Sequence, residues 1–289
     1  MKKQLLEGKK LEKVFSSGLF INKIITRAVS NISLNIEEGK PIIRAIAGES
    51  GSGKTTLARM LLGLIKPTSG EINFEGKNIF DLNSNEKLRF RRRVQPIFQD
   101  PFGVFNPFYK VDRVLNTPIK KFNVSNNKTE IKDRIEDALN SVGLRPDETL
   151  GRFPHELSGG QRQRIMVARA LSLEPKIIIA DEPVSMVDAS LRATILESIY
   201  NFKKNQNISV LYITHDLTTA HQLCDDIMIL YKGKMVEAGP IDSVVRDPKH
   251  VYTKHLVGSI PFPDPKMKWK KFDENEKLDL DKPSIGWRK

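Results

Sequence analysis

The eight residues Gly48-Glu49-Ser50-Gly51-Ser52-Gly53-Lys54-Thr55 decide the fold of this chain. They follow the apolar run 42–47 and open a stretch with helical spacing, so the sequence predicts strand, glycine-rich loop and helix in succession. Glycines let backbone N–H groups turn inward without a Cβ in the way, and the helix start adds the positive end of its dipole. The stretch therefore predicts a loop that cradles the phosphates of a nucleotide.

The loop residues have separate expected tasks. Lys54 is expected to reach the β- and γ-phosphates, and the Thr55 hydroxyl to ligate Mg²⁺. A glycine-rich turn that fits the pattern by chance is the alternative reading. The predicted nucleotide-binding residues of this segment are Gly48, Ser50, Gly51, Ser52, Gly53, Lys54, Thr55 and Thr56.

Two acidic residues end another apolar run, Ile177-Ile178-Ile179-Ala180-Asp181-Glu182. In open α/β sheets ligands sit at the carboxyl ends of strands, where the phosphate loop is also expected. Asp181 is expected to hold Mg²⁺ through water, and Glu182 to polarise the water that attacks the γ-phosphate. A strand capped by solvated acids is the plainer alternative, and the nearby phosphate-loop motif favours the first reading.

The string Leu157-Ser158-Gly159-Gly160-Gln161 offers a hydroxyl and two glycine N–H groups at the start of a predicted helix. It resembles the signature sequence of ABC transporter ATPases. In that family the signature of one subunit closes on the ATP held by the phosphate loop of the other, so the resemblance implies catalysis shared across a dimer. The residues that it places in trans are Ser158, Gly159, Gly160, Gln161 and Asp188.

Three further positions match that family. Gln99 corresponds to the glutamine that senses Mg²⁺ and water and links to the membrane partner. His215 corresponds to the switch histidine that contacts the γ-phosphate, and Phe15 fits the aromatic that stacks on adenine, with an ordinary strand residue as the alternative for Phe15. The implied cofactors are ATP and Mg²⁺. The implied catalytic residues are Glu182, His215 and Gln99, and the implied metal ligands are Thr55, Gln99 and Asp181.

The resemblance covers about residues 9–260 and implies an α/β fold, a P-loop NTPase (RecA-like) core with an antiparallel β layer and an inserted α-helical subdomain. An ATPase domain is expected over 1–261, with the helical subdomain at about 82–165 and a C-terminal extension over 262–289. Apolar runs predict strands at 29–36, 42–47, 71–75, 177–180, 209–214 and 226–230. The stretch 81–152 has helical texture, with one apolar stripe formed by Ile131, Ile135, Ala138, Leu139 and Val142.

Composition restricts the cellular setting. The 289 residues carry 47 basic and 35 acidic side chains, a net charge of +12, and neither a signal peptide nor an apolar run of about 18 residues is visible. We expect a peripheral subunit on the cytoplasmic face of the cell membrane. The single Cys224 excludes an internal disulfide and a cysteine-ligated cluster within one chain. The dense basic run 87–93 suits a solvated helix face or strand entrance better than a nucleic-acid contact.

Two segments indicate the branch of the family. Residues 98–107 (FQDPFGVFNP) and 247–253 (DPKHVYT) are similar to segments of dipeptide and oligopeptide importers. That branch also includes importers of nickel and other small solutes, which remain the alternative. Some ATPases of this branch carry a C-terminal iron–sulfur cluster on several cysteines, and this chain resembles the type that lacks them. That type is paired with a different ATPase, so a heterodimer with a second ABC ATPase is the expectation and a homodimer the alternative. The other implied partners are two transmembrane permeases and, indirectly, an extracellular solute-binding protein, with no nucleic acid.

Two rival functions and one open structural question accompany this reading. A non-transport ABC ATPase acting on nucleic acid or ribosomes generally has two ATPase units or a long coiled coil, which this sequence lacks. A regulatory subunit that binds ATP without hydrolysing it is disfavoured by Lys54, Asp181, Glu182 and His215. The aromatic residues Phe102, Phe105, Phe108 and Tyr109 suit either a groove for a membrane-subunit helix or the core of the helical subdomain.

Overall fold

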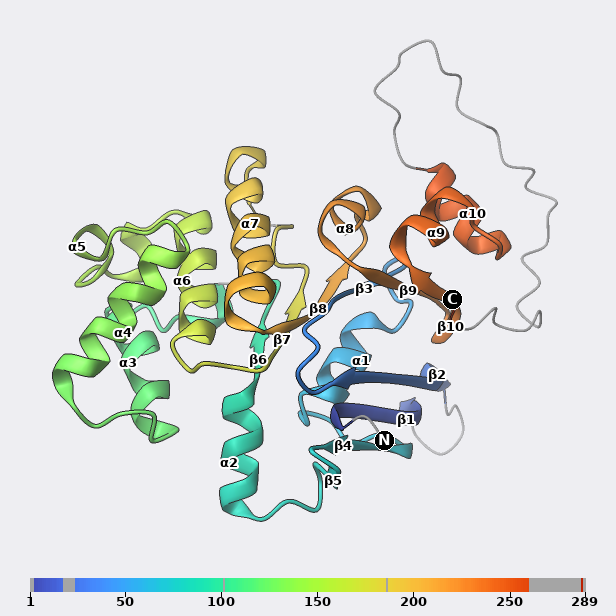
Figure 1. Cartoon of the computed structure of the whole chain (residues 1–289), viewed down its shortest axis with the longest axis horizontal. Helices are drawn as coiled ribbons and strands as arrows, with labels where there is room; N and C mark the ends of the chain where they lie inside the picture. The colour runs from blue at the N-terminus through green and yellow to red at the C-terminus, as the bar shows by residue number, and fades with distance from the viewer. Residues whose placement is uncertain (1–2, 18–23, 101, 186, 260–286, 288–289) are drawn as a thin grey trace, which may run out of the picture. The chain divides into compact units, whose positions relative to one another are not determined.

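The computed structural model describes residues 3–17, 24–100, 102–185, 187–259 and 287. Two compact units make up the chain (Figure 1). The first unit comprises Met1–Leu5, Ile36–Ile42 and Asn73–Leu211, and the second comprises Leu6–Asn35, Ile43–Ile72 and Tyr212–Lys289. Each unit is therefore assembled from three separate stretches of sequence.

The first unit combines a short parallel strand pair with a group of helices. Strand β6 pairs with β7 from Val94↔Ile177 to Ile97↔Ala180. Helices α3 and α4 pack against α6, and Figure 1 draws this group in green to yellow-green. The elements of this unit are β5 (Lys77–Asn78), α2 (Ser84–Arg93), β6 (Val94–Ile97), η1 (Phe102–Val104), α3 (Asp112–Lys121), α4 (Lys128–Ser141), α5 (Pro146–Thr149), η2 (Pro154–Glu156), α6 (Gly159–Leu171), β7 (Ile177–Asp181) and α7 (Ala189–Gln206).

The second unit is built from two groups of strands. One follows the order β2-β1-β4 and the other β10-β9-β3, with β3 parallel and β10 antiparallel to β9. Strands β1, β2 and β4 reach into the first unit at one end, and β8 contributes three residues to each unit. The elements are β1 (Gln4–Ser17), β2 (Ile24–Glu37), β3 (Ile43–Ala47), α1 (Lys54–Leu61), β4 (Ser69–Phe74), β8 (Ser209–Thr214), α8 (Leu217–Leu223), β9 (Asp226–Tyr231), β10 (Lys234–Pro240), α9 (Ile241–Arg246) and α10 (Val251–Gly258).

Helix α4 shows why the sequence forms these elements. The Asn127 side chain accepts the N–H groups of Thr129 and Glu130 and so caps the first turn. The predicted apolar stripe is buried along its whole length, because residues three and four apart share one helix face. Its members are Ile131, Ile135, Ala138, Leu139 and Val142. The amphipathic prediction is confirmed.

The N-terminal strands are longer than predicted. Short strands were expected in the first 80 residues, whereas β1 and β2 each span 14 residues. In β1 the buried Leu6 and Leu11 are five residues apart, an odd spacing that hides the alternation of a strand. Lys10 has φ +44° and Asn31 in β2 has φ +52°, so each strand contains a local irregularity that shifts which side chains point inward.

The stretch expected to be helical contains a strand. Val94–Ile97 forms β6, directly after α2. The prediction was wrong there because Pro96 and the preceding basic run conceal the strand signal. Pro96 is compatible with this position because β6 is the last strand in its sheet order, where a missing N–H costs little. The basic run lies mainly on α2, where Arg89 pairs with Glu75 at 2.8 Å.

Near the C-terminus, only Trp287 lies within the described residues beyond position 259. It forms a parallel β-bridge with Ala238 of β10, and its ring lies 4.3 Å from the Arg44 guanidinium. Arg44 also donates two hydrogen bonds of 2.7 Å to Asp226, whose pKa is raised by burial despite this partner. Within the described ranges, no helix has the length and apolar composition needed to cross a membrane.

Candidate functional site

The predicted phosphate loop connects β3 to α1 in the second unit. Its glycines are required by the backbone: Gly48 has φ +150° and Gly53 has φ +104°. A Cβ on Gly48 would lie 2.1 Å from the Leu230 carbonyl oxygen, and one on Gly53 would lie 2.2 Å from that of Ala28. The loop is therefore held against neighbouring backbone at both ends, and only glycine fits at either point.

Inside the loop, Lys54 is buried and its ammonium group points back into the turn. The Nζ atom donates to the Gly48 and Glu49 carbonyl oxygens at 2.6 and 2.8 Å. The Ser52 hydroxyl is also buried and has no hydrogen-bond partner among the described residues. Ser52 N–H donates to the Glu49 carbonyl at 3.1 Å, which closes the turn.

These features fit a bound phosphate chain. A buried ammonium group and an unsatisfied buried hydroxyl both favour an anion as partner. Helix α1 begins at Lys54, directly after Gly53, so its N-terminal dipole faces the same turn. The exposed Thr55 and half-buried Thr56 follow in the first helical turn. The loop therefore has the backbone conformation, the charge and the hydroxyl groups that binding of a nucleoside triphosphate requires.

In the first unit, the structure joins two of the predicted catalytic residues. The Gln99 Nε2 group donates to Glu182 Oε2 at 2.8 Å. Asp181 is the last residue of β7, and Glu182 follows it with φ +46°. A left-handed conformation is costly for a glutamate, and such strain is concentrated at functional sites. The prediction that Asp181 and Glu182 stand at the carboxyl end of a strand is confirmed.

The signature string begins α6 as predicted, and the structure adds a capping box. The Ser158 hydroxyl accepts the Gln161 N–H at 3.2 Å, while Gln161 Oε1 accepts the Ser158 N–H at 2.8 Å. Gly159 and Gly160 occupy the first helical positions, whose N–H groups have no intrahelical acceptor. A Cβ on Gly160 would lie 2.7 Å from Leu191 of α7, the helix whose N-cap is Asp188.

Two residues of α6 that the sequence analysis did not single out hold the strand leading to Gln99. Arg169 donates to the Pro96 carbonyl at 3.2 Å, and Gln163 donates to the Phe98 carbonyl at 3.4 Å. The signature helix and the Gln99 segment are thus tied together through side-chain bonds to backbone. Helical spacing alone gives no signal for such bonds, because their acceptors are carbonyl groups distant in sequence.

His215 and Phe15 both belong to the second unit and are exposed. His215 lies between β8 and α8, directly before Asp216, which caps α8 by accepting the Thr218 N–H at 2.9 Å. The Phe15 ring lies on β1 with Lys13 Nζ 5.2 Å from its centre. Both positions leave the side chain accessible, and the expected roles of the two residues stay predictions.

Of the aromatic residues after Gln99, one is packed in the core and two are exposed, one of them beside a hollow. Phe105 is buried, whereas Phe108 is 84% exposed. The Tyr109 ring is also exposed and stacks on the Arg113 guanidinium at 3.9 Å. Tyr109 lines a hollow of about 330 Å³ together with Val104, Asn106, Lys110, Arg113, Val114, Thr117, Pro118 and Arg169. Core packing and an accessible groove therefore occur together, and the side chain of Phe102 lies outside the described residues.

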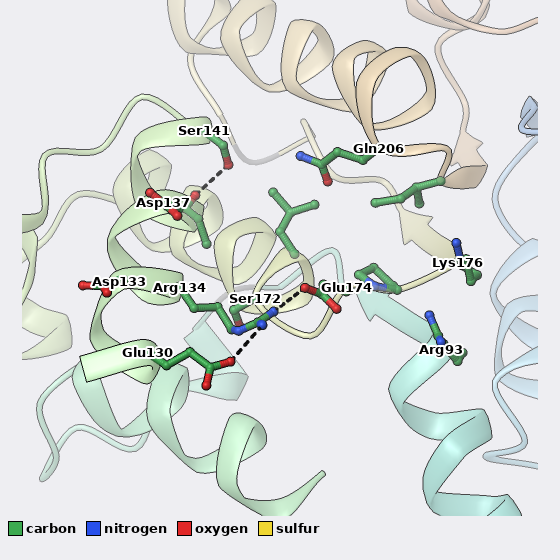
Figure 2. Close-up of a pocket in the computed structure, with 14 residues that line it drawn as sticks. Arg93, Glu130, Asp133, Arg134, Asp137, Ser141, Ser172, Glu174, Lys176 and Gln206 are labelled. Atoms are coloured by element: carbon green, nitrogen blue, oxygen red, sulfur yellow. Dashed lines mark hydrogen bonds and ion pairs between the residues drawn. The ribbon is translucent and has the colours of Figure 1, made fainter. Parts of the chain in front are cut away.

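A larger groove in the first unit contains none of the predicted site residues. Figure 2 shows it between α4 and the turn after α6. Its volume is about 590 Å³. Arg134 of α4 contacts Glu174 at 2.6 Å and Glu130, one turn away on the same helix, at 3.5 Å. Arg92 also contacts Glu174, at 3.5 Å. Arg134, Glu130 and Glu174 thus form a local ion-pair network at this groove.

The predicted residues thus form two sets. The phosphate loop, Phe15 and His215 belong to the second unit. Gln99, Asp181, Glu182, Asp188 and the signature residues 158–161 belong to the first. Their meeting around one nucleotide remains a prediction, and Met186 of the segment before Asp188 lies outside the described residues.

Comparisons with known proteins identify the family of the chain. The family described as ABC transporter matches residues 29–185. The oligopeptide transport ATP-binding protein OppF of Streptococcus mutans serotype c is 39% identical over 282 residues, 96% of this chain and 90% of that protein. OppF of Salmonella typhimurium is 37% identical over 254 residues, 88% of this chain and 74% of that protein. A solved dimeric ATP-binding cassette bound to ADP and Pi is 28% identical, with a TM-score of 0.72, and the match covers 82% of this chain and 98% of that one.

Proposed function

The chain belongs to the ABC transporter family as an ATP-hydrolysing subunit, and we propose that it powers the import of di- and oligopeptides. One observation carries the choice of solute. The likeness to a protein named for oligopeptide transport extends over 96% of this chain, well beyond the matched family segment. The two segments 98–107 and 247–253, which resemble those of peptide importers, support the same choice, and the first of them contains Gln99.

ATP binding is assigned to the phosphate loop. The Lys54 ammonium group and the backbone N–H groups of residues 50–54 would hold the β- and γ-phosphates. Thr55 and Asp181 would hold Mg²⁺, which suits an ion that binds one or two protein oxygens and otherwise water and phosphate. When bound, Mg²⁺ neutralises charge on the phosphates. Phe15 would stack on the adenine, since its ring is exposed on β1.

Hydrolysis is assigned to Glu182, assisted by Gln99 and His215. The 2.8 Å bond from Gln99 orients the Glu182 carboxylate, which would accept a proton from the attacking water. His215 would contact the γ-phosphate. Positioning and neutralisation of charge then supply most of the catalysis.

The expected partners follow from the family, and two surfaces of the first unit suit them. A second ABC ATPase would receive the signature residues 158–161 against its own bound ATP, and we favour a heterodimer. A permease helix would lie in the hollow beside Tyr109. Its lining includes Lys110, Arg113 and Arg169 and no acidic residue, so a helix with carboxylates or a free C-terminal end fits best. This assembly would hold the chain at the cytoplasmic face of the membrane.

Replacing Glu182→Gln tests the catalytic assignment. The amide keeps the size of the side chain but cannot accept a proton, so hydrolysis by the assembled transporter should fall on the order of 100-fold or more while ATP binding persists. Phosphate release and nucleotide affinity measure the two effects. Glu136→Gln on α4 makes the same chemical change on a helix surface and should leave both unchanged. Near-normal hydrolysis by Glu182→Gln would exclude Glu182 as the base.

Purification of the chain from its native membranes in mild detergent tests the transport assignment. Two membrane-spanning proteins, a second ATPase and a solute-binding protein should be retained together. The ligand carried by the binding protein then identifies the solute: peptide supports the proposal, and nickel or another small solute replaces it. Recovery of nucleic acid or ribosomes without membrane proteins would leave the ATPase activity in place and overturn the transport function.

A further inference from the structure

Tyr252, which is distant in sequence from every predicted site position, contacts the phosphate loop. It lies in α10, is 2% exposed, and its hydroxyl oxygen accepts the Glu49 N–H at 2.9 Å. We propose that Tyr252 is a positioning residue for ATP binding, which holds the first turn of the phosphate loop in its binding conformation. The proposal rests on ATP binding by this family and is independent of the solute transported.

The contact acts on one particular peptide group. The Gly48 carbonyl oxygen accepts a hydrogen bond of 2.6 Å from Lys54 Nζ, and the Glu49 N–H of the same peptide group donates to Tyr252. The plane between Gly48 and Glu49 is therefore held at both ends. Rotation of this plane would move the carbonyl oxygen away from Lys54 and change the place of the ammonium group that reaches the phosphates. Gly48 has φ +150°, and glycine can adopt many other backbone conformations. A hydrogen bond that restrains this peptide plane therefore favours the binding conformation of the loop.

The position of Tyr252 is itself fixed by buried groups. Glu237 of β10 is 0% exposed and accepts the N–H groups of Lys249 and His250 at 3.0 to 3.2 Å. The His250 Nδ1 atom in turn accepts the Tyr252 N–H at 3.1 Å. The segment that carries Tyr252 is thus anchored to the sheet before α10 begins, and the restraint on the loop has a rigid base.

The surroundings of the ring keep the hydroxyl group neutral and in place. The Tyr231 ring lies 4.2 Å from that of Tyr252, tilted by 30°. Burial raises the pKa of Tyr252 to about 12. The hydroxyl oxygen therefore remains protonated at neutral pH and accepts the Glu49 N–H as a neutral group. The segment 247–253, which indicated the importer branch by resemblance, acquires a physical role in the ATP site.

The variant Tyr252→Phe removes only the hydroxyl group. The Glu49 N–H then loses its acceptor and the loop loses one restraint, so ATP affinity of the full chain should fall roughly tenfold. In the assembled transporter KM for ATP should rise by a similar factor, while kcat at saturating ATP changes less than about twofold. A merely structural role would lower thermal stability without this separation of KM from kcat.

Tyr231→Phe is the matched control. It removes the same atom from the neighbouring ring, and within the described residues Tyr231 makes no hydrogen bond to the loop. Its ATP affinity should equal that of the wild type. Unchanged affinity in Tyr252→Phe, or an equal loss in both variants, would overturn the proposal.

Amide hydrogen exchange in the wild-type chain gives a second test, which requires no variant. Glu49 has an exposed side chain, but its N–H is bound to a buried hydroxyl. NMR-detected hydrogen exchange should therefore find this amide protected in the absence of nucleotide. Exchange at the rate of a free loop amide would show that the bond does not restrain the loop, and would overturn the proposal.

Discussion

The phosphate loop and the signature segment use the same materials, glycine and serine at the start of a helix, but differ in how they are held. In the loop, Gly48 and Gly53 have positive φ and press against backbone oxygens, and Lys54 is buried within the turn. In the signature, Gly159 and Gly160 lie in an ordinary helical turn. A Cβ on Gly159 would meet no atom within 4 Å.

This difference accords with the prediction that one chain builds the first cradle and that a partner completes the second. The loop has its charge, backbone form and restraints within the second unit. The signature has a capped helix end and an exposed Ser158, with no buried cation of its own among the residues of its turn. A helix end alone attracts anions weakly in water. The signature therefore suits a site completed by the nucleotide and loop of another subunit.

The largest difference in stability and ATP affinity is expected between two glycine-to-alanine variants, one in the phosphate loop and one in the signature. Gly53→Ala puts a Cβ 2.2 Å from the Ala28 carbonyl at φ +104°, so it should lower the free energy of unfolding by about 2–4 kcal/mol and ATP affinity on the order of 100-fold. Gly159→Ala should keep the stability and the ATP affinity of the single chain, and lower only hydrolysis by the assembled pair. Thermal unfolding and ATP titration measure both. Equal loss of affinity in the two variants would remove the distinction.

An intermediate effect is expected from Ser158→Ala. Loss of the cap should cost about 1 kcal/mol of stability, and hydrolysis by the pair should fall about tenfold, with ATP affinity of the single chain unchanged. Asn127→Ala removes the cap of α4 in the same way and serves as control, since it should match the stability cost without affecting hydrolysis. If the two variants lose hydrolysis equally, the effect of Ser158 is only on folding.

The smallest effect concerns the far end of the signature helix. The hydrogen bond from Arg134 lowers the pKa of Glu174, which follows α6 (Figure 2). A carboxylate with a lowered pKa stabilises the fold above its ordinary pKa of 4.5 and loses that contribution as pH falls through the folded value. Because the pair is partly exposed, Glu174→Gln should cost at most about 1 kcal/mol at pH 7 and less at pH 3.

Urea unfolding of Glu174→Gln at the two pH values measures this contribution. Asp133→Asn in the same groove is the control, since Asp133 forms no ion pair within the described part of the chain. ATP affinity should be unchanged in both variants. A stability loss that is the same at pH 7 and pH 3 would mean that Glu174 does not act through its charge.

Much of the site could be predicted from the sequence because its chemistry is local. The phosphate loop needs glycines at fixed offsets from Lys54, and the Asp181-Glu182 pair directly follows an apolar strand. The amphipathic stripe of α4 was also readable, since a helix repeats its buried face within a few residues. Strand β8 was predicted with the same limits that the structure shows.

What could not be predicted depends on contacts between distant segments. The strand β6 was hidden by Pro96, and the length of β1 by the positive φ of Lys10. The bond between Tyr252 and Glu49 joins residues 203 positions apart, and Arg169 reaches a carbonyl 73 positions away. Neither bond has a periodic pattern, because a backbone N–H or carbonyl group is present at almost every position and carries no sequence signal.

The stacking of Trp287 on Arg44 gives the protein an optical reporter. The sequence contains two tryptophans, Trp269 and Trp287. With Trp269→Phe in place, the emission of the remaining indole depends on its guanidinium neighbour and on its contact with β10. Detachment of this residue from the sheet would transfer the ring to water and move its fluorescence to longer wavelength. The docking of Trp287 on β10 can thus be followed in solution without an added label.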